Sequence, residues 1–153
     1  MNDLVTASVD ETTTQYIVVN LGSEHFGINI RYIDNIVRVP SITRVPNVQP
    51  FFKGVINLRG EVIPVMNLRI KLGLSEIENT NKTRIIIIKL DPSAAIGITV
   101  DEVEEVIDLT EEQIEKVTSD SKDDKAGYIH TVGKSEKGLI SLLDLAAVIG
   151  EDK

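Results

Sequence analysis

The stretch FGINIRYIDNIV at positions 26–37 is repeated, without gaps, as IGITVDEVEEVI at positions 96–107. Gly27 matches Gly97 and the apolar positions coincide in the two stretches, so both predict the same local structure. A second ungapped pair follows, in which VIPVMNL at 62–68 matches LISLLDL at 139–145. The two repeated stretches together predict a fold made of two copies of one five-stranded unit.

Each unit is predicted to consist of short strands. Apolar clusters of a few residues alternate with turn residues such as Arg59-Gly60, and no window offers three turns of amphipathic helix. The expected strands are 15–21, 26–30, 35–39, 54–58, 62–66, 84–90, 96–100, 105–109, 127–132 and 138–143.

Helices are expected only as short pieces near 68–72, 111–117 and 145–149. Asn67 and Asp144 are suited to cap the first and last of these, and Gly73 and Gly150 to take the left-handed position after them. The middle one opens on a Thr110–Gln113 capping box. The two units differ at 39–50, where three prolines disfavour a helix and predict an ordered loop. The polar stretch 75–83 is the expected linker between the units.

Composition excludes several classes of protein. The 153 residues include no cysteine and two histidines, which removes disulfides and thiolate metal sites. The net charge of −8 argues against a nucleic-acid partner. No apolar run approaches the roughly 20 residues that span a bilayer, and the start of the chain resembles no signal peptide, so we expect a cytoplasmic protein with no membrane insertion.

The charge is unevenly distributed. Seven basic and seven acidic side chains balance up to Glu76, so the later residues carry the whole net charge of −8. Five of the six arginines lie in the balanced half, and arginine is enriched at protein–protein contacts.

Motifs for catalysis or metal binding fail on inspection. GKS at 133–135 lacks the earlier glycine of a phosphate-binding loop. The acids at 101–105 alternate with valines as a solvated strand edge does, and 120–124 lacks the glycine of a calcium loop. His25 and His130 have no serine elbow nearby. We expect no catalytic residue, no cofactor and no metal.

One segment is more specific. FKGVINLRGEVIPVMNLR at 52–69 reads as strand, hairpin tip, strand and helix cap, with Arg59 at the exposed tip. Together with QYIVV at 15–19, the repeated run at 26–30 and TRVP at 43–46, it resembles the CheW family of bacterial chemotaxis coupling proteins. The resemblance extends from Gln15 to about Gly150.

The resemblance implies a mainly β fold of two intertwined five-stranded SH3-like β-barrels with a few short helices. The expected division is a flexible N-terminus at 1–14, a first barrel at 20–82, a second barrel formed by 15–19 with 83–150, and a tail at 151–153. The first strand thus joins the second barrel.

The resemblance also implies a non-enzymatic adaptor. In the family such a protein bridges the cytoplasmic tips of methyl-accepting chemoreceptors and the regulatory domain of the histidine kinase CheA, as a monomer alone and in arrays with its partners at receptor clusters. The implied receptor-binding residues are Ile17, Ile30, Ile33, Gly54, Arg59 and Val100. The implied kinase-binding residues are Val39, Ile42 and Thr43.

Other readings stay open. Any one of the aliphatic candidates is better explained by burial in a barrel core than by contact with a partner. The residues assigned to the core are Phe26, Ile28, Ile63, Val65, Ile86, Ile88 and Ile140. An enzyme would need a catalytic constellation and a small-ligand barrel would need a cavity, which five strands are too few to enclose. The nearest alternative is the same coupling role in a non-flagellar, pilus-type chemosensory system.

Overall fold

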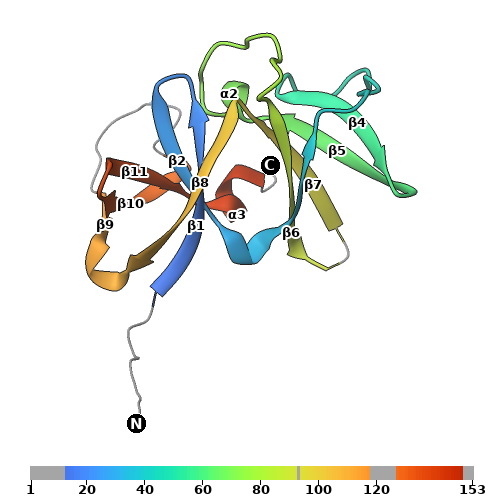
Figure 1. Ribbon diagram of the computed structural model, residues 1–153. Coiled ribbons are helices and arrows are strands. Elements are labelled where there is room, and N and C mark those ends of the chain that lie inside the picture. The colour runs from blue at the N-terminus through green and yellow to red at the C-terminus, as the bar shows by residue number, and fades with distance from the viewer. Residues whose placement is uncertain (1–12, 93, 118–126, 150–153) are drawn as a thin grey trace.

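The computed structural model describes residues 13–92, 94–117 and 127–149, which form two strongly curved sheets side by side (Figure 1). The six-stranded sheet has the order β8-β1-β2-β11-β10-β9, and the five-stranded sheet the order β3-β6-β7-β5-β4. The strands are β1 (Thr13–Leu21), β2 (Glu24–Asn29), β3 (Ile33–Arg38), β4 (Phe52–Leu58), β5 (Glu61–Asn67), β6 (Arg84–Asp91), β7 (Ala94–Val100), β8 (Glu102–Thr110), β9 (Ile114–Lys116), β10 (Ile129–Ser135) and β11 (Gly138–Leu143). All ten predicted strands are present, and β9 is additional.

The strand orders of the two sheets correspond to each other as the sequence repeat predicts. If β1, β2, β3, β4 and β5 are matched to β6, β7, β8, β10 and β11, the order β8-β1-β2-β11-β10 becomes β3-β6-β7-β5-β4. The first hairpin of each repeat therefore lies in a sheet whose other strands come from the other repeat: β1–β2 joins strands of the second repeat, and β6–β7 joins strands of the first. The mainly β, intertwined fold is therefore confirmed.

The expected boundaries between the two barrels are wrong. Not only 15–19 but the whole β1–β2 hairpin lies in the six-stranded sheet, and the β6–β7 hairpin, expected in the second barrel, lies in the five-stranded sheet. The cause is two parallel pairings between distant strands: Gly27 lies opposite Leu142, and its repeat equivalent Gly97 lies opposite Val65. The N-terminal boundary also moves, because Thr13 already pairs with Thr110.

Gly27 and Gly97 are glycines because side chains cross above them. A Cβ atom built on Gly27 would lie 2.7 Å from the Leu142 side chain, and one on Gly97 would lie 2.7 Å from the Ile85 side chain. Because real Cβ contacts are longer, a side chain at these positions would displace Leu142 of the parallel partner strand β11 or Ile85 of the antiparallel neighbour β6, so glycine favours close strand packing at both places.

The six-stranded sheet also curls toward itself. The Nζ atom of Lys137, at the β10–β11 tip, lies 3.0 Å from Glu105 Oε2 and 3.6 Å from Glu104 Oε2 on β8. Leu109 and Ile140 meet in the same apolar cluster beneath this contact. Contact between the two outer parts of one sheet is what a small barrel requires.

Three apolar clusters form the core: one inside each curved sheet and a larger one between the sheets. The β6 run of four isoleucines shows the division, because Ile85 and Ile87 face the five-stranded sheet's own cluster while Ile86 and Ile88 face the central one. Strands buried on both faces read as unbroken apolar runs. Every residue assigned to the core from sequence is buried.

Two of the three predicted helices are confirmed as α2 (Leu68–Lys71) and α3 (Leu145–Ile149). The Asn67 side chain accepts hydrogen bonds from two helix amides, the Asp144 carboxylate accepts one from Ala147, and Gly73 has φ 83°. Gly150 lies outside the described residues.

The third predicted helix, at 111–117, is wrong beyond its first turn. The Thr110 amide donates to Gln113 Oε1 at 2.9 Å, as a capping box requires, but only the 3₁₀ turn η3 (Glu111–Gln113) follows. The chain then pairs with β10 as β9, and the side-chain nitrogen Nε2 of Gln113 donates to the Lys134 carbonyl oxygen. Pairing with an available sheet edge prevails over the capping signal.

Candidate functional site

The β4–β5 hairpin projects from the body of the molecule, at the right of Figure 1. Its two-residue turn, Arg59-Gly60, has positive φ at both positions, 55° and 85°, and the Gly60 amide donates to Asn57 Oδ1. This is the turn that matches the twist of a hairpin, but it normally takes asparagine or glycine first. Arg59 is exposed, and its side chain places a guanidinium group at the tip of the hairpin. Its left-handed backbone conformation is strained for a residue other than glycine.

Gly54 is buried and has a structural role. Its φ is 143°, and a Cβ atom built there would overlap the carbonyl oxygen of Thr43. Thr43 pairs with Val55 through two hydrogen bonds of 2.8 Å, which fixes the 39–50 loop on β4. Gly54 therefore supports the neighbouring surface by letting this loop approach.

The kinase candidates lie along that loop. Val39 and Ile42 are half-buried against the five-stranded sheet's cluster, as expected of an ordered loop. Thr43 is exposed, and farther along Val45 and Val48 are 39% and 42% exposed. The backbone of Thr43 is hydrogen-bonded to Val55 of β4. The Thr43 side chain and the two valines form the outer surface of the loop.

The other aliphatic candidates separate into two groups. Ile17 is 5% and Val100 1% exposed, and both pack in the central cluster. Ile30 and Ile33 are half-buried at the edge of the same cluster. Ile30 and Ile33 therefore have side-chain surface that a partner could contact. Ile17 and Val100 are buried in the core and have almost none.

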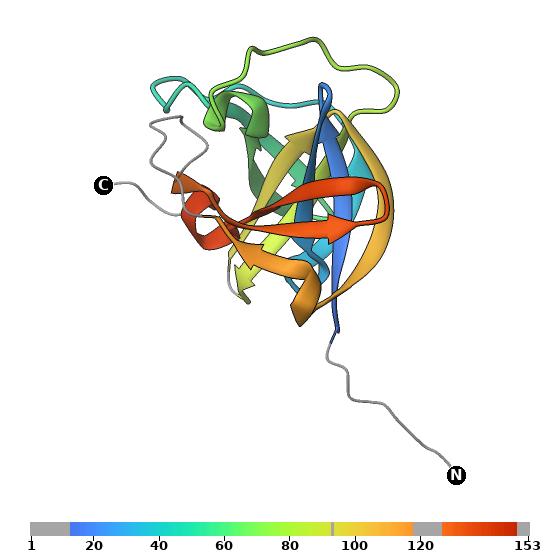
Figure 2. The ribbon, with the colours of Figure 1, turned by 90° about the vertical axis from the view of Figure 1, so that its left-hand side faces the viewer.

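We call this edge the seam, defined by Ile30, Ile33, Ile36, Val103 and Val106. Ile33 and Ile36 lie on β3, and Val103 and Val106 lie on β8; these are terminal strands of their respective sheets. Ile30 lies just before β3, in the 3₁₀ turn η2 (Ile30–Tyr32). Ile36 and Val103 are half-buried, and Val106 is 50% exposed. Figure 2 shows β8 on the opposite side of the molecule from α3.

Sequence reasoning did not name Ile36, Val103 and Val106 as candidates, although the sequence contains a signal for them. The first repeated stretch matches Ile33 with Val103 and Ile36 with Val106. A site that contains the residues of β3 is therefore expected to have equivalent residues on β8. The second repeated stretch matches Val62 with Leu139, the two most exposed large apolar side chains among the described residues, at 63% and 64%.

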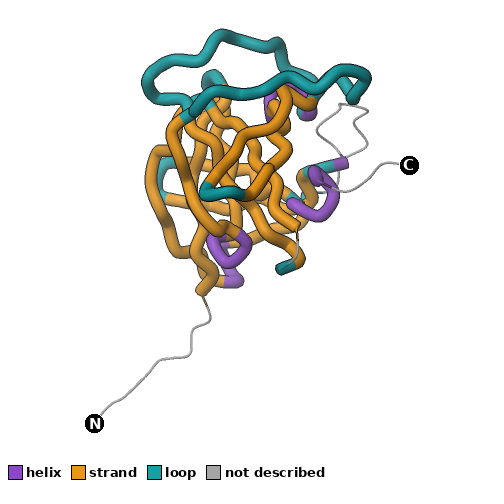
Figure 3. The backbone as a smooth tube through the Cα atoms, turned by 90° about the vertical axis from the view of Figure 1, so that its right-hand side faces the viewer, coloured by secondary structure: helices purple, strands orange, loops and turns teal. Residues whose placement is uncertain are grey.

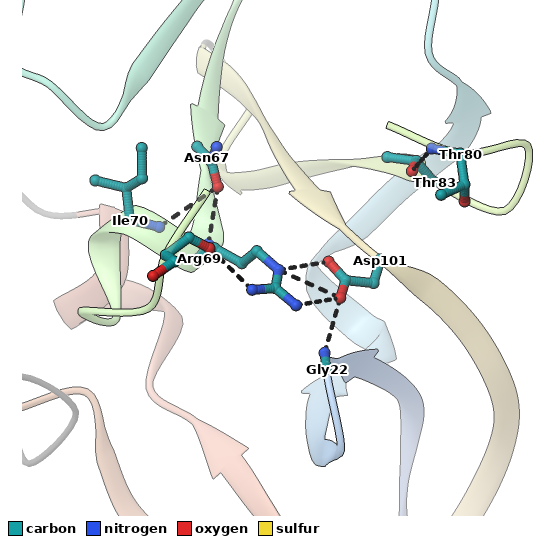
Figure 4. Close-up of polar contacts among 8 residues, drawn as sticks. Gly22, Asn67, Arg69, Ile70, Thr80, Thr83 and Asp101 are labelled. Carbon is teal, nitrogen blue, oxygen red and sulfur yellow. Dashed lines mark hydrogen bonds and ion pairs between the residues drawn. The ribbon is translucent and has the colours of Figure 1, made fainter. Parts of the chain in front are cut away.

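A partly buried ion pair joins the two sheets on the α2 side (Figure 4). Arg69 Nε lies 2.9 Å from Asp101 Oδ1 and Arg69 Nη2 lies 2.8 Å from Oδ2, while the Gly22 amide donates to Oδ2 at 2.7 Å. Partial burial raises the pKa of Asp101, but hydrogen bonds from Arg69 and Gly22 and the Arg69 charge outweigh it and lower the pKa overall. The pair connects α2 to the crossover between β7 and β8, and the Gly22 amide connects that crossover to the β1–β2 turn.

No cluster of three or more potential metal ligands occurs among the described residues. Within the same residues, no helix is long and apolar enough to cross a membrane. The site consists of surfaces: the seam, the hairpin tip and the outer face of the 39–50 loop.

Comparison with known proteins agrees with this architecture. The CheW-like domain model matches residues 15–153. The chain belongs to the CheW family. Its sequence is 36% identical to the Chemotaxis protein CheW of Bacillus subtilis, over 93% of this chain and 90% of that one.

Other CheW proteins are similar in sequence and in structure. The CheW of Thermotoga maritima is 33% identical over 86% of this chain and 84% of its own. The crystal structure of the scaffolding protein TtCheW from Thermoanaerobacter tengcongensis superposes with a TM-score of 0.83 and 29% identity, covering 92% of this chain and 95% of that one. Protein PilI of Pseudomonas aeruginosa is 30% identical over only 54% of this chain and 46% of its own length. The resemblance found in the sequence is confirmed.

Proposed function

We propose that this CheW-family protein is a non-enzymatic cytoplasmic adaptor that couples methyl-accepting chemoreceptors to the histidine kinase CheA in chemotaxis. The observation that carries the proposal is the seam: half-buried or exposed apolar side chains that both repeats leave at the margin of the core, near the terminal strands of the two sheets. Apolar side chains that gather at the surface in this way are typical of a docking surface.

The receptor contact is assigned to the seam and the neighbouring hairpin. Ile30 and Ile33 present apolar surface, and Arg59 presents a cation that can donate several hydrogen bonds to receptor carboxylates or carbonyls. Ile17 and Val100 act beneath them as core, and Gly54 acts by holding the adjacent loop. Of the six receptor-binding candidates, this proposal assigns direct contact with the receptor to Ile30, Ile33 and Arg59.

The contact with the CheA regulatory domain is assigned to the outer face of the 39–50 loop, around Thr43. Val39 and Ile42 anchor the loop, so their truncation would act indirectly. The charge distribution supports partners of different kind at the two sheets: residues 30–101 carry ten basic and six acidic side chains, and the rest of the chain six basic and eighteen acidic. Unequal charge favours contacts between unlike surfaces and opposes pairing of like ones.

The experiment is titration calorimetry with the cognate CheA regulatory domain, followed by kinase assays with receptor. We expect micromolar binding, roughly −8 kcal/mol. Arg59→Ala should leave kinase-domain binding unchanged and lose receptor-dependent kinase activation, while Glu136→Ala, at the repeat-equivalent tip of the β10–β11 hairpin, should retain both. A folded protein that binds neither partner contradicts the proposal.

A second candidate is the same coupling role in a pilus-type chemosensory system. The partial likeness to PilI favours it, although it covers about half of each chain. Affinity capture that recovers chemoreceptors and CheA of a flagellar system would exclude it.

A further inference from the structure

A small cavity lies between the 39–50 loop, β4 and α2, and its free volume is about 160 Å³. This is below the range of about 300–1,000 Å³ that is usual for small-molecule sites, so the cavity suits a single side chain of a protein partner. Figure 3 shows that the two long loops that contribute to it cross the same end of the molecule. Its apolar lining comes from Ile42, Phe52 and Ile70, and its charged lining from Arg44, Lys53 and Glu76.

The close approach at Gly54 brings two cations to this cavity from different segments. A Cβ atom built on Gly54 would lie 3.0 Å from the Cα atom of Arg44, so the loop backbone lies directly against β4 at this point. Lys53 is the residue before Gly54. Arg44 from the loop and Lys53 from β4 therefore border the same cavity.

The two cations have few acceptors within the protein. The Nζ atom of Lys53 lies 4.0 Å from Glu76 Oε2, which is longer than the roughly 2.7–2.9 Å of a charge-assisted hydrogen bond. Within the described residues, no acceptor is hydrogen-bonded to the side chain of Arg44 or Lys53. The Lys53 side chain is 19% exposed and the Glu76 side chain 57%, so Glu76 is the partner that can turn into solvent. The cavity thus has N–H donors that are available to a second anion.

The surrounding segment is basic, although the protein as a whole is acidic. Residues 35–60 contain four basic side chains and no acidic one, in a chain whose net charge is −8. Of the described residues that line the cavity, two are cations and only Glu76, from the linker, is an acid. The local charge therefore favours an anionic occupant.

We propose that this cavity binds the carboxylate of an aspartate or glutamate side chain on the CheA regulatory domain, the partner assigned to the 39–50 loop. The inference rests on the proposed function and adds the chemistry that the partner has to supply. The surplus of cations selects a carboxylate, and the volume of the cavity selects one side chain rather than a larger ligand.

Binding exchanges an internal carboxylate for one from the partner. The Arg44 guanidinium can donate two parallel hydrogen bonds to the incoming carboxylate, and the Lys53 ammonium can donate another. The methylene groups of the incoming side chain pack against Phe52 and Ile70, which line the cavity. Glu76 competes with the partner for Lys53, so removing the Glu76 charge should strengthen binding.

The test is titration calorimetry of the full-length chain with the regulatory domain. Arg44→Gln and Lys53→Met should each weaken binding at least about tenfold, because each removes hydrogen bonds to a charged group. Arg38→Gln is the matched control: it removes the same charge from an exposed position on β3 that does not line the cavity, so affinity should change by less than about twofold.

Two further readouts distinguish a carboxylate site from an apolar contact. Glu76→Gln should strengthen binding by roughly two- to fivefold, the size of effect expected for an exposed ion pair. Added salt should weaken the binding of wild type more than that of Arg44→Gln, because salt screens the attraction between the partner's acid and the cavity. Weaker binding by Glu76→Gln, or equal salt dependence of the two proteins, would contradict the proposal.

The partner's acid can be identified by charge reversal. Each acidic residue of the regulatory domain is changed to lysine in turn, and one of these variants should lose affinity for wild type and regain it with Arg44→Glu. If none does, the carboxylate site is overturned. If the chain alone forms a dimer that Arg44→Gln abolishes, a second copy is the occupant and the assignment is wrong.

The failure of this inference and the failure of the proposed function give different results. Wild type that binds the regulatory domain as tightly as Arg44→Gln and Lys53→Met do overturns the carboxylate site alone. Wild type that is folded and does not bind the regulatory domain overturns both.

Discussion

Arg69 and Asp101, far apart in the sequence, form a two-pronged ion pair that connects the helix at the end of one sheet to the crossover that enters the other. The Gly22 amide adds a third bond from the β1–β2 turn. Because Asp101 lies between β7 of one sheet and β8 of the other, we expect loss of this pair to change how the two halves of the seam are positioned.

We expect Arg69→Ala to lower the free energy of unfolding by about 1 to 3 kcal/mol, because it leaves a partly buried carboxylate without its cation. Chemical denaturation measures this. Arg44→Ala, at an exposed loop position, is the control and should change stability by less than about 0.5 kcal/mol.

The same pair predicts a pH dependence. The pKa of Asp101 is lower in the folded protein than its ordinary value, so the stabilisation is complete above about pH 4 and is lost as the pH falls through the folded value. Wild type should therefore lose stability on acidification below about pH 4 more steeply than Asp101→Asn does. Parallel curves for the two proteins would contradict the assignment.

Arg59→Asn should separate stability from coupling. Asparagine tolerates the left-handed conformation better than arginine, so the hairpin should become more stable, by about 0.5 kcal/mol. Receptor-dependent kinase activation should nevertheless be lost with the guanidinium. Thermal unfolding and the coupled kinase assay measure the two effects, and a variant that is both more stable and fully coupling would remove Arg59 from the site.

Gly54→Ala should detach the 39–50 loop. The added Cβ atom meets the Thr43 carbonyl at a backbone with φ 143°, so we expect a loss of about 2 to 5 kcal/mol and faster hydrogen exchange at Thr43 and Val55. Gly60→Ala is the matched control: its φ is also positive, but no atom lies within 4 Å of the new Cβ, so only about 1 kcal/mol should be lost.

Ile17→Ala tests the division between core and surface. Truncating a buried isoleucine should cost about 2 to 5 kcal/mol of stability, and Ile17→Val about 0.5 to 1.5 kcal/mol. Protein that remains folded should still bind receptor. Ile33→Asp should do the reverse, retaining most of its stability at the half-buried seam while losing receptor binding in a pull-down.

The local structure and the internal repeat could be predicted from the order of the residues alone. Alternating or unbroken apolar runs located ten strands, Asn67 and Asp144 located two helix starts, and Arg59-Gly60 located a hairpin tip, because each depends on residues within a few positions of one another. The repeat predicted that Ile28 and Ile98 occupy equivalent environments, and both lie in the central cluster.

Which strand joins which sheet, and therefore which side chains reach the surface, depends on contacts between residues that are distant in the sequence. The exchange of hairpins depends on the parallel contacts of Gly27 with Leu142 and Gly97 with Val65, which no local signal encodes. An aliphatic residue in a strand has the same local pattern in a core and at an edge. Ile17 is buried because β1 is interior to its sheet, and Ile33 reaches the surface because β3 is terminal: sheet position is a property of long-range pairing.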